Sequence, residues 1–300
     1  MTNSSLVSKL LFKNRVAIKF LPTLLASSIF RVFLFKIFNN LSDLEKEELF
    51  YHSNIFLFNN NTKINEGEVS VFFNNIEIKI PHKSGSINQL GRAFSLMGHD
   101  YDVKKCYKFL VKNFKINVFY DVGANFGQHS LLMLSQKINC FAFEPNKQCH
   151  YELLEIPSYN SFKDLSLIPK AVGANTATGY LNFPENETWL GTISASGNDI
   201  HKVPIISLDN FSEKNLLPDL IKIDTEGFEL NVLKGSKRLI IKQKPFIIFE
   251  SLEDKDKIYN FFESLKYVIL DLKSYAKLNQ NEFHVLNGNF LACPLSKYNF

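Results

Sequence analysis

The sequence has few of the residues from which disulfide scaffolds, metal clusters or membrane spans are built. Its 300 residues include four cysteines without a Cys-x-x-Cys spacing, so it predicts reduced thiols in a cytoplasmic protein and indicates neither zinc nor disulfides. The formal net charge of +4 is too small to indicate a nucleic-acid partner. Residues 20–30 form the longest uncharged run near the N-terminus, about half of the roughly 20 residues that span a bilayer.

Acidic residues are absent from the first 42 positions, where the sequence is both basic and apolar. The basic residues there are Lys9, Lys13, Arg15, Lys19, Arg31 and Lys36. Two interpretations fit residues 1–42. One is a basic amphipathic helix on an anionic membrane, at its inner face; the other is a helix docked on the protein's own core or at a dimer interface. A signal peptide fits poorly, because no small-residue cleavage site follows a single apolar core.

Glycine is also scarce, with 13 residues, yet two glycines fall in one short turn. Residues 118–130 are typical of an apolar strand, a turn from Gly123 to Gly127 and the start of a helix, and a second strand ends at Glu144. About 20 residues separate Gly123 from Glu144, the usual interval between a ligand-approaching glycine turn and a ribose-binding carboxylate. The pattern therefore predicts a ligand that carries adenosine.

The residues of this turn suit a positively charged ligand better than a dinucleotide. Glycines let the backbone approach a ligand closely, and Asn125 tolerates the left-handed region. The three-glycine dinucleotide fingerprint is absent, and Asp121 before the turn would repel a pyrophosphate. An acid there suits the amino group and sulfonium of S-adenosylmethionine (SAM), whose ribose Glu144 would hold. The alternative is a strand–turn–helix whose glycines serve packing alone.

From residue 116 onward, strands and helices alternate, which predicts an α/β fold with a parallel, doubly wound sheet. We expect strands at 116–122, 139–144, 164–172, 219–224 and 246–251, helices at 128–137, 146–156, 226–241 and 254–266, and two closing strands at 267–272 and 283–293.

The chain is expected to fall into two parts, since it is long enough for one sizeable core and a small extra unit. Residues 1–100 form an N-terminal extension with a basic apolar helix, a β-hairpin at 69–80 and a short helix. Residues 101–300 form the main domain. Within it, residues 178–209 lack helical periodicity and are expected to form a β-rich insertion or lid.

A second cluster of acidic residues lies at 219–229, where the fourth strand runs into its helix. Ligands of such sheets bind beyond the carboxyl ends of the strands, so Asp224 is expected on the same edge as the glycine turn. Glu226 and Glu229 lie in the first turn of the following helix, where they also complement its dipole. Glu250 ends the next strand and is a further candidate.

Five ordered motifs give these residues a family resemblance. The motifs are Asp-Val-Gly-Ala-Asn-Phe-Gly-Gln-His-Ser (121–130), Phe-Glu-Pro (143–145), Ala-Val-Gly (171–173), Ile-Lys-Ile-Asp-Thr-Glu-Gly-Phe-Glu (221–229) and Leu-Lys-Gly (233–235). Together they resemble the FkbM family of SAM-dependent methyltransferases over about residues 100–294. The resemblance implies a class I methyltransferase (Rossmann-like) fold with a terminal antiparallel strand pair. It also implies O-methylation of a hydroxyl on a sugar, glycan or secondary metabolite.

Position by position, the resemblance implies a set of cofactor-binding residues. They are Asp121, Gly123, Asn125, Gly127 and Ser130 in the SAM loop, Glu144 at the ribose, and Asp224 at the methionine end or the reacting methyl.

Removal of the proton from the acceptor hydroxyl can be assigned in more than one way. A carboxylate, Asp224 or Glu226, or a histidine, His129 or His201, would serve as general base. A divalent metal held by Asp224, Glu226 and Glu250 would instead acidify the hydroxyl. The sequence does not rank base against metal.

The expected partner is a small-molecule or glycan acceptor, and the sequence does not name it. Three rival functions remain at this point. They are an N-methyltransferase, another nucleotide-dependent enzyme, and a non-catalytic SAM-binding or membrane-associated assembly subunit.

Overall fold

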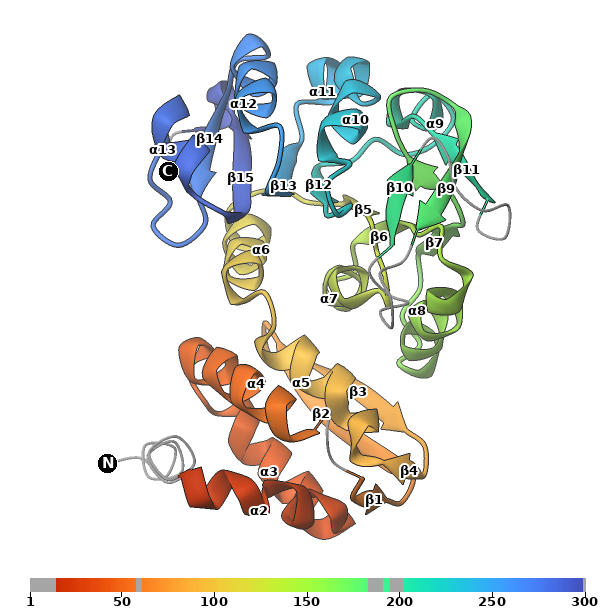
Figure 1. Ribbon diagram of the computed structural model, residues 1–300, viewed down its shortest axis with the longest axis vertical. Coiled ribbons are helices and arrows are strands. Elements are labelled where there is room, and N and C mark those ends of the chain that lie inside the picture. Colours follow the sequence, from red (N-terminus) through yellow and green to blue (C-terminus); the bar gives the residue numbers. More distant parts are fainter. Residues whose placement is uncertain (1–14, 58–60, 183–190, 195–201, 299–300) are drawn as a thin grey trace. The chain divides into compact units, whose positions relative to one another are not determined.

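The computed structural model describes residues 15–57, 61–182, 191–194 and 202–298 (Figure 1). The chain divides into two compact units. The N-terminal unit comprises Met1–Lys104 with Ser158–Ser161, and the C-terminal unit comprises Lys105–Pro157 with Phe162–Phe300. This division lies close to the boundary expected between residues 100 and 101.

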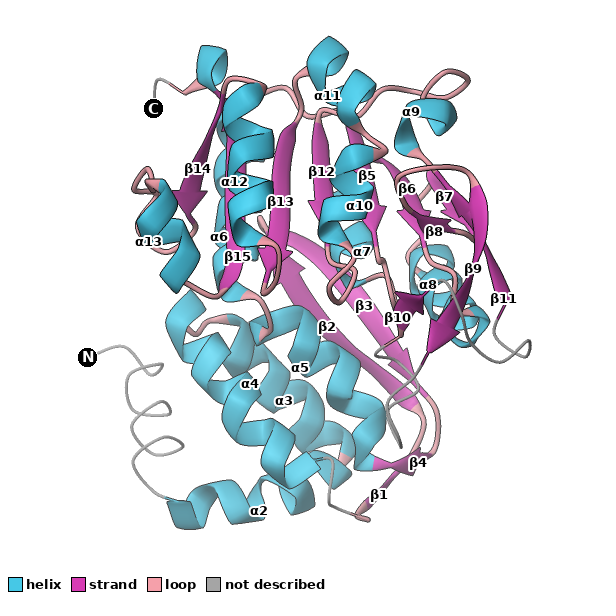
Figure 2. Cartoon of the chain, turned by 45° about the horizontal axis from the view of Figure 1, so that its top comes forward, coloured by secondary structure: helices cyan, strands magenta, loops and turns pink. Residues whose placement is uncertain are grey.

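The N-terminal unit combines helices with a β-hairpin. Its elements are α2 (Arg15–Ala26), α3 (Ser28–Asn39), α4 (Asp43–Leu57), β1 (Lys63–Ile64), β2 (Gly67–Phe73), β3 (Ile76–His82), β4 (Gly85–Ser86), η1 (Ile87–Leu90) and α5 (Gly91–Gly98). Helices α3 and α5 pack on β2, and α4 packs on α5 (Figure 2). Helix α6 (Tyr101–Asn113) begins in this unit and ends in the next.

The hairpin of β2 and β3 confirms the prediction for residues 69–80. Asn74 and Asn75 have φ angles of +47° and +64°, as the two central residues of a type I′ turn require. Val71 pairs with Ile78 in this hairpin, and both side chains are buried. The turn therefore sets the register that directs the apolar face into the unit's core.

Helix α4 has no counterpart among the predicted elements, although its start carries a recognisable signal. The Ser42 backbone N–H donates to Oε2 of Glu45 at 2.8 Å, and the Glu45 N–H donates to Oγ of Ser42 at 3.3 Å. These reciprocal bonds form a capping box, the pattern expected of Ser-x-x-Glu at a helix N-terminus.

The C-terminal unit is built on a seven-stranded sheet with the strand order β14-β15-β13-β12-β5-β6-β7. The strands are β5 (Val118–Val122), β6 (Asn139–Phe143), β7 (Leu165–Ile168), β12 (Leu220–Ile223), β13 (Phe246–Ser251), β14 (Tyr267–Asp271) and β15 (Gly288–Pro294). All neighbours pair in parallel except β15, which is antiparallel to both β13 and β14. This arrangement confirms the class I methyltransferase fold with its closing antiparallel pair.

Helices flank this sheet on both faces (Figure 2). The helices are α7 (Gln128–Ser135), α8 (Lys147–Tyr159), α9 (Leu208–Phe211), α10 (Glu229–Lys234), α11 (Lys237–Gln243), α12 (Lys255–Ser264), α13 (Gln280–Val285) and η3 (Leu295–Lys297). Every residue of β5 and of β12 is buried, as expected for central parallel strands that are covered on both faces. Polar side chains at these positions therefore need partners inside the protein.

Three predicted elements differ from the structure. The strand expected at 164–172 is two strands, β7 and β8 (Ala171–Val172), which belong to different sheets. Pro169 lies between them and lacks the N–H that a continuous strand needs. The helix expected at 226–241 is the two helices α10 and α11. Helix α10 begins at Glu229, so the prediction that Glu226 lies in its first turn was wrong: Glu226 has a φ of +52° and lies in the loop before the helix.

The strand expected at 283–293 was wrong at its start, because residues 283–285 belong to helix α13. Asn279 and Glu282 form a capping box that begins this helix, and β15 starts only at Gly288. A local side-chain cap therefore prevails over the apolar pattern of the segment.

A second sheet, in the order β10-β9-β11-β8, occupies the expected insertion. Its further strands are β9 (Ala177–Asn182), β10 (Thr192–Ser194) and β11 (Lys202–Ile206). Residues 183–190 and 195–201, which belong to the same predicted segment, lie outside the described residues. The role of this segment as a lid stays a prediction.

Two glycines of the sequence motifs contact each other in the C-terminal unit. A Cβ on Gly235 would lie 2.0 Å from the carbonyl oxygen of Gly173. Because that neighbour is backbone, we expect Gly235→Ala to lower the free energy of unfolding by about 1–3 kcal/mol. Urea denaturation measures this, with Lys234→Ala, at the exposed preceding position, as the matched control. A Gly235→Ala midpoint equal to that of the wild type would contradict the packing role.

Candidate active site

The glycine turn lies at the carboxyl end of β5 and is fixed by both neighbouring strands. Gly123 has a φ of +82°, and a Cβ there would lie 1.8 Å from the carbonyl oxygen of Asp224. The N–H groups of Gly123 and Ala124 both donate to the carbonyl oxygen of Phe143, at 3.0 and 3.1 Å. Asn125 and Gly127 also have positive φ angles, of +49° and +77°. The turn thus has the left-handed backbone that the sequence predicted.

Glu144 follows β6 and directs its carboxylate at this turn. Its Oε2 accepts the N–H of Asn125 at 2.7 Å, and its Oε1 accepts the N–H of Asn146 at 2.6 Å. The side chain is 6% exposed, and this burial raises the pKa of Glu144 to about 7, although the two N–H groups act against the rise. Each carboxylate oxygen can accept a second hydrogen bond, as two ribose hydroxyls would require.

Asp121 is buried and bonded to the first turn of α7. Its Oδ2 accepts the N–H of Ser130 at 2.9 Å and the Ser130 hydroxyl at 2.6 Å. Burial raises the pKa of Asp121, whereas the charge of His129, the Ser130 hydrogen bonds and the charge of Lys222 lower it. In this structure Asp121 and Ser130 tie β5 to α7; their contact with SAM stays a prediction.

Lys222 lies at the centre of the sheet, in the middle of β12, and is fully buried. Its Nζ donates to Oδ2 of Asp224 at 2.9 Å. The Asp224 side chain, beyond the end of the strand, is 28% exposed. A lysine is rarely buried to this extent unless it is paired, so the ion pair explains how an apolar strand accommodates it.

Glu250, near the end of the adjacent strand β13, completes a cluster with Asp224 and Lys222. Burial raises the pKa of Glu250 to about 8, the charge of Asp224 and a hydrogen bond with it add to the rise, and Lys222 opposes it. This rise favours the protonated form of Glu250 near neutral pH, beside the Asp224 carboxylate.

Glu226 and Glu229 have different surroundings. Oε1 of Glu229, which is buried, accepts the N–H and the hydroxyl of Thr225, both at 2.9 Å, and the N–H of Gly227 at 3.2 Å. Glu229 therefore holds the loop after β12. Glu226 lies at the exposed rim, where partial desolvation and then the charges of Asp224 and Glu229 raise its pKa.

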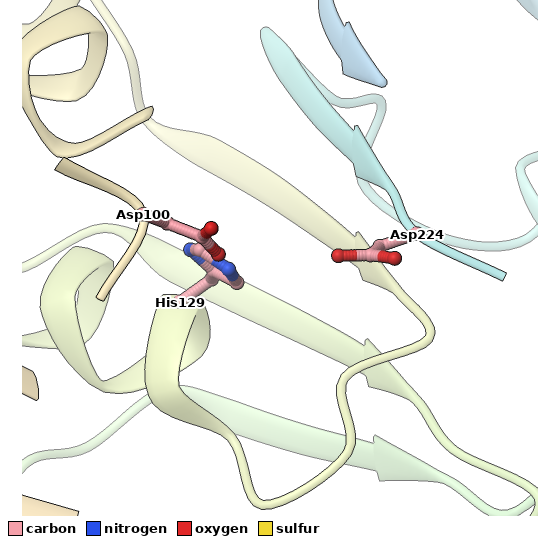
Figure 3. Close-up of side chains that lie close together, drawn as sticks. All are labelled: Asp100, His129 and Asp224. Atoms are coloured by element: carbon pink, nitrogen blue, oxygen red, sulfur yellow. The ribbon is translucent and has the colours of Figure 1, made fainter. Parts of the chain in front are cut away.

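His129 lies in the first turn of α7, with its ring edge-on to Tyr107 at 5.7 Å. One of its imidazole nitrogens lies within 4.8 Å of a carboxylate oxygen of Asp224 (Figure 3). Asp100, also labelled in the figure, belongs to the N-terminal unit. The other candidate histidine, His201, lies outside the described residues.

The comparisons with known proteins identify the family. The sequence matches the methyltransferase FkbM domain over residues 121–272, half of the chain. The chain belongs to the FkbM methyltransferase family. Among curated proteins, it is 34% identical over 138 residues to the hexuronic acid methyltransferase AglP of Haloferax volcanii, which covers 45% of this chain and 55% of that protein. The chain thus spans about half the length of this relative.

Solved methyltransferases are more distant. The FkbM methyltransferase of Methylobacillus flagellatus is 15% identical, with a TM-score of 0.42 over 69% of this chain and 59% of that one. An rRNA methylase of Streptococcus thermophilus is 12% identical, with a TM-score of 0.39 over 64% of this chain and 93% of that one.

Within this FkbM domain, the structure brings most of the predicted residues to one edge of the sheet. Asp224, Glu144 and the glycine turn lie at the carboxyl ends of neighbouring parallel strands. Sequence reasoning missed Lys222, although a single lysine inside the apolar run Leu220–Ile223 was a signal for it. The predicted metal ligands were Asp224, Glu226 and Glu250. Among the described residues, their carboxylate oxygens do not form a group in which all three lie within 4.8 Å of one another.

The raised pKa values predict how stability depends on pH. Glu144 and Glu250 have folded-state pKa values of about 7 and about 8, above the ordinary glutamate value of 4.5. Between about pH 4.5 and about pH 8, the folded state therefore binds more protons than the unfolded state, so the stability of the folded state falls as pH rises. We expect the melting temperature of ligand-free protein to fall from about pH 5 to about pH 8. Differential scanning fluorimetry measures this; Glu250→Gln should flatten the upper part of the curve, and an unchanged slope would contradict the assignment.

Proposed function

We propose that this protein transfers the methyl group of SAM to a hydroxyl of a sugar or glycan. Membership of the FkbM methyltransferase family supports methyl transfer, and the name of the Haloferax relative supports an acceptor that contains a sugar acid. The observation that carries the proposal is the close approach of the loop at Asp224 to the glycine turn at Gly123. The backbone of Asp224 packs directly against Gly123, so the carboxyl groups of Asp224 and Glu250 adjoin the turn that would hold the cofactor.

The residues at the turn fit SAM. Glu144 offers carboxylate oxygens to a ribose, and the left-handed turn leaves no Cβ at Gly123 or Gly127. Acidic side chains at the same edge complement the amino group and sulfonium. When bound, SAM supplies an electrophilic methyl group, and the protein's contribution is alignment and proton removal.

The carboxyl cluster suits the removal of a proton from a weakly acidic hydroxyl. Glu250 forms a hydrogen bond with Asp224, and Nζ of Lys222 donates to Oδ2 of the same carboxylate. Asp224 is the partly exposed member and would accept the acceptor's proton, a role worth about 10²–10⁴-fold in rate. His129, within 4.8 Å of Asp224, is the second candidate base.

Methyl transfer from tritiated SAM to oligosaccharides with and without uronic acids tests this proposal. A sugar acid can be methylated on a hydroxyl, as an ether, or on its carboxylate, as an ester. Alkali treatment of the product distinguishes the two, because alkali hydrolyses only the ester. We expect an alkali-stable methyl ether, formed on a hydroxyl. An alkali-labile methyl ester would show transfer to a carboxylate, which needs no base, and would contradict the assignment to a hydroxyl. Labelling of an amine acceptor alone would favour N-methylation.

A further inference from the structure

Helices α2 and α3 present large apolar side chains to solvent. The exposed residues are Phe20, Leu24, Ile29, Phe30, Val32 and Phe33, and we call this set the apolar face. Ile29 is 80% exposed and Phe33 is 58% exposed. Scattered exposed apolar residues are ordinary, but six large ones within 14 consecutive residues on two neighbouring helices indicate contact with a partner or a membrane.

Helix α3 differs from a surface helix of a globular protein because apolar side chains lie on both of its sides. Leu34, Phe35 and Phe38 are buried, and the outer side is apolar as well. Arg31 lies on its inner side and is 1% exposed, whereas its outer side carries Ile29 and Phe33. The Arg31 guanidinium donates to the carbonyl oxygens of Leu25 at 2.9 Å and Ala26 at 3.4 Å. The guanidinium of Arg31 therefore provides hydrogen-bond donors for the last carbonyl groups of α2, and it does not lie on the outer surface.

The same contact supports a sharp bend between the two helices. The chain bends by 116° between Phe20–Ala26 and Ser28–Asn39, with the break at Ser27. No single helix in the described ranges is long and apolar enough to cross a membrane, and this bent pair reaches that length and composition only when both helices are counted together. Two short helices with an apolar outer side and a sharp bend have the geometry of an element that lies in the plane of a bilayer surface.

The charge of this segment is complementary to anionic lipid. Besides the buried Arg31, residues 1–42 contain five Lys or Arg, and they contain no Asp or Glu. Lys36 lies exposed on α3 beside the apolar residues. A second copy of the same segment would bring like charges together, whereas anionic headgroups would attract them.

We propose that α2 and α3 form an in-plane membrane-binding element whose apolar face inserts into the headgroup region of an anionic bilayer. The proposal is independent of the catalytic assignment. It explains together the buried Arg31, the exposed apolar face and the absence of acidic residues before Asp43.

Co-sedimentation of the full chain with lipid vesicles tests this proposal. The probes are vesicles of phosphatidylcholine with about 30 mol% phosphatidylglycerol, and vesicles of phosphatidylcholine alone. We expect binding to the anionic vesicles that weakens in about 0.5 M NaCl. The double variant Ile29→Asn/Phe33→Asn should bind at least about tenfold more weakly, because it removes two side chains from the lipid contact. Leu216→Asn/Val285→Asn, at exposed positions of the C-terminal unit, is the matched control and should bind as the wild type does.

Three results would overturn the proposal. The first is no binding to either kind of vesicle, and the second is equal binding by the wild type and Ile29→Asn/Phe33→Asn. The third is a wild-type dimer in light scattering that this variant converts to a monomer, without vesicle binding, which would assign the apolar face to a second copy of the chain.

Discussion

Replacing Asp224 with Asn is expected to lower kcat for methyl transfer by about 10²–10⁴-fold, because the amide cannot accept the acceptor's proton. The shape of the side chain is kept, and the contact of the Asp224 backbone with Gly123 is unaffected, so the affinity for SAM should change little. Steady-state kinetics with saturating SAM measure the loss, and calorimetry measures the affinity.

Asp224→Asn removes the negative charge that pairs with buried Lys222, so a loss of activity could come from a loss of folding. A second variant separates the two causes. Glu250→Gln keeps that ion pair and removes only the ionisable carboxyl group of Glu250. It should remove the ionisation near pH 8 from the pH profile of kcat. Glu263→Gln, an exposed carboxylate in the last turn of α12, is the control and should leave kcat unchanged. Near-wild-type kcat in folded Asp224→Asn would rule out Asp224 as the base and favour His129.

Replacing Glu144 with Ala is expected to weaken SAM binding by about 100-fold. The estimate takes the loss of two hydrogen bonds to a charged group at about 1.5 kcal/mol each. Because the pKa of Glu144 is about 7 in the free protein, SAM should also bind more tightly as pH rises from about 6 to about 8, by about tenfold. The sign follows from the ribose hydroxyls, which donate best to the ionised carboxylate.

Isothermal titration calorimetry across this pH range measures both effects. Glu144→Gln keeps one of the two oxygens that accept the N–H groups of Asn125 and Asn146. The affinity of this variant for SAM should be weak and independent of pH near neutrality. Glu226→Gln, at the exposed rim, should retain the pH dependence. Tight SAM binding by Glu144→Gln, with the wild-type pH dependence, would remove the ribose assignment.

The fold was largely predictable because its signals are local. The type I′ turn at Asn74-Asn75, the left-handed Asn125 and the glycine turn each follow from backbone preferences that one or two residues determine. The sheet could be anticipated because long apolar strands alternate with helices. The helix at 280–285 was missed because its cap at Asn279 outweighs the apolar pattern.

The site was less predictable because its chemistry depends on contacts between strands. The sequence places Asp224 and Glu250 at two strand ends 26 positions apart, but the raised pKa of Glu250 beside Asp224 follows from the pairing of β12 with β13 and from burial. Glu226 and Glu229 look equivalent in the sequence. Only the bonds of Glu229 to Thr225 and Gly227 separate a loop-holding carboxylate from an exposed one.

Calorimetric titration of the purified full chain with SAM and S-adenosylhomocysteine, with NAD as the control, tests the central claim most directly. The account predicts micromolar binding of both adenosyl ligands and none of NAD, because the turn lacks the dinucleotide fingerprint and Glu144 is positioned for one ribose. Binding of NAD, or no binding of either adenosyl ligand by a folded sample, would contradict it.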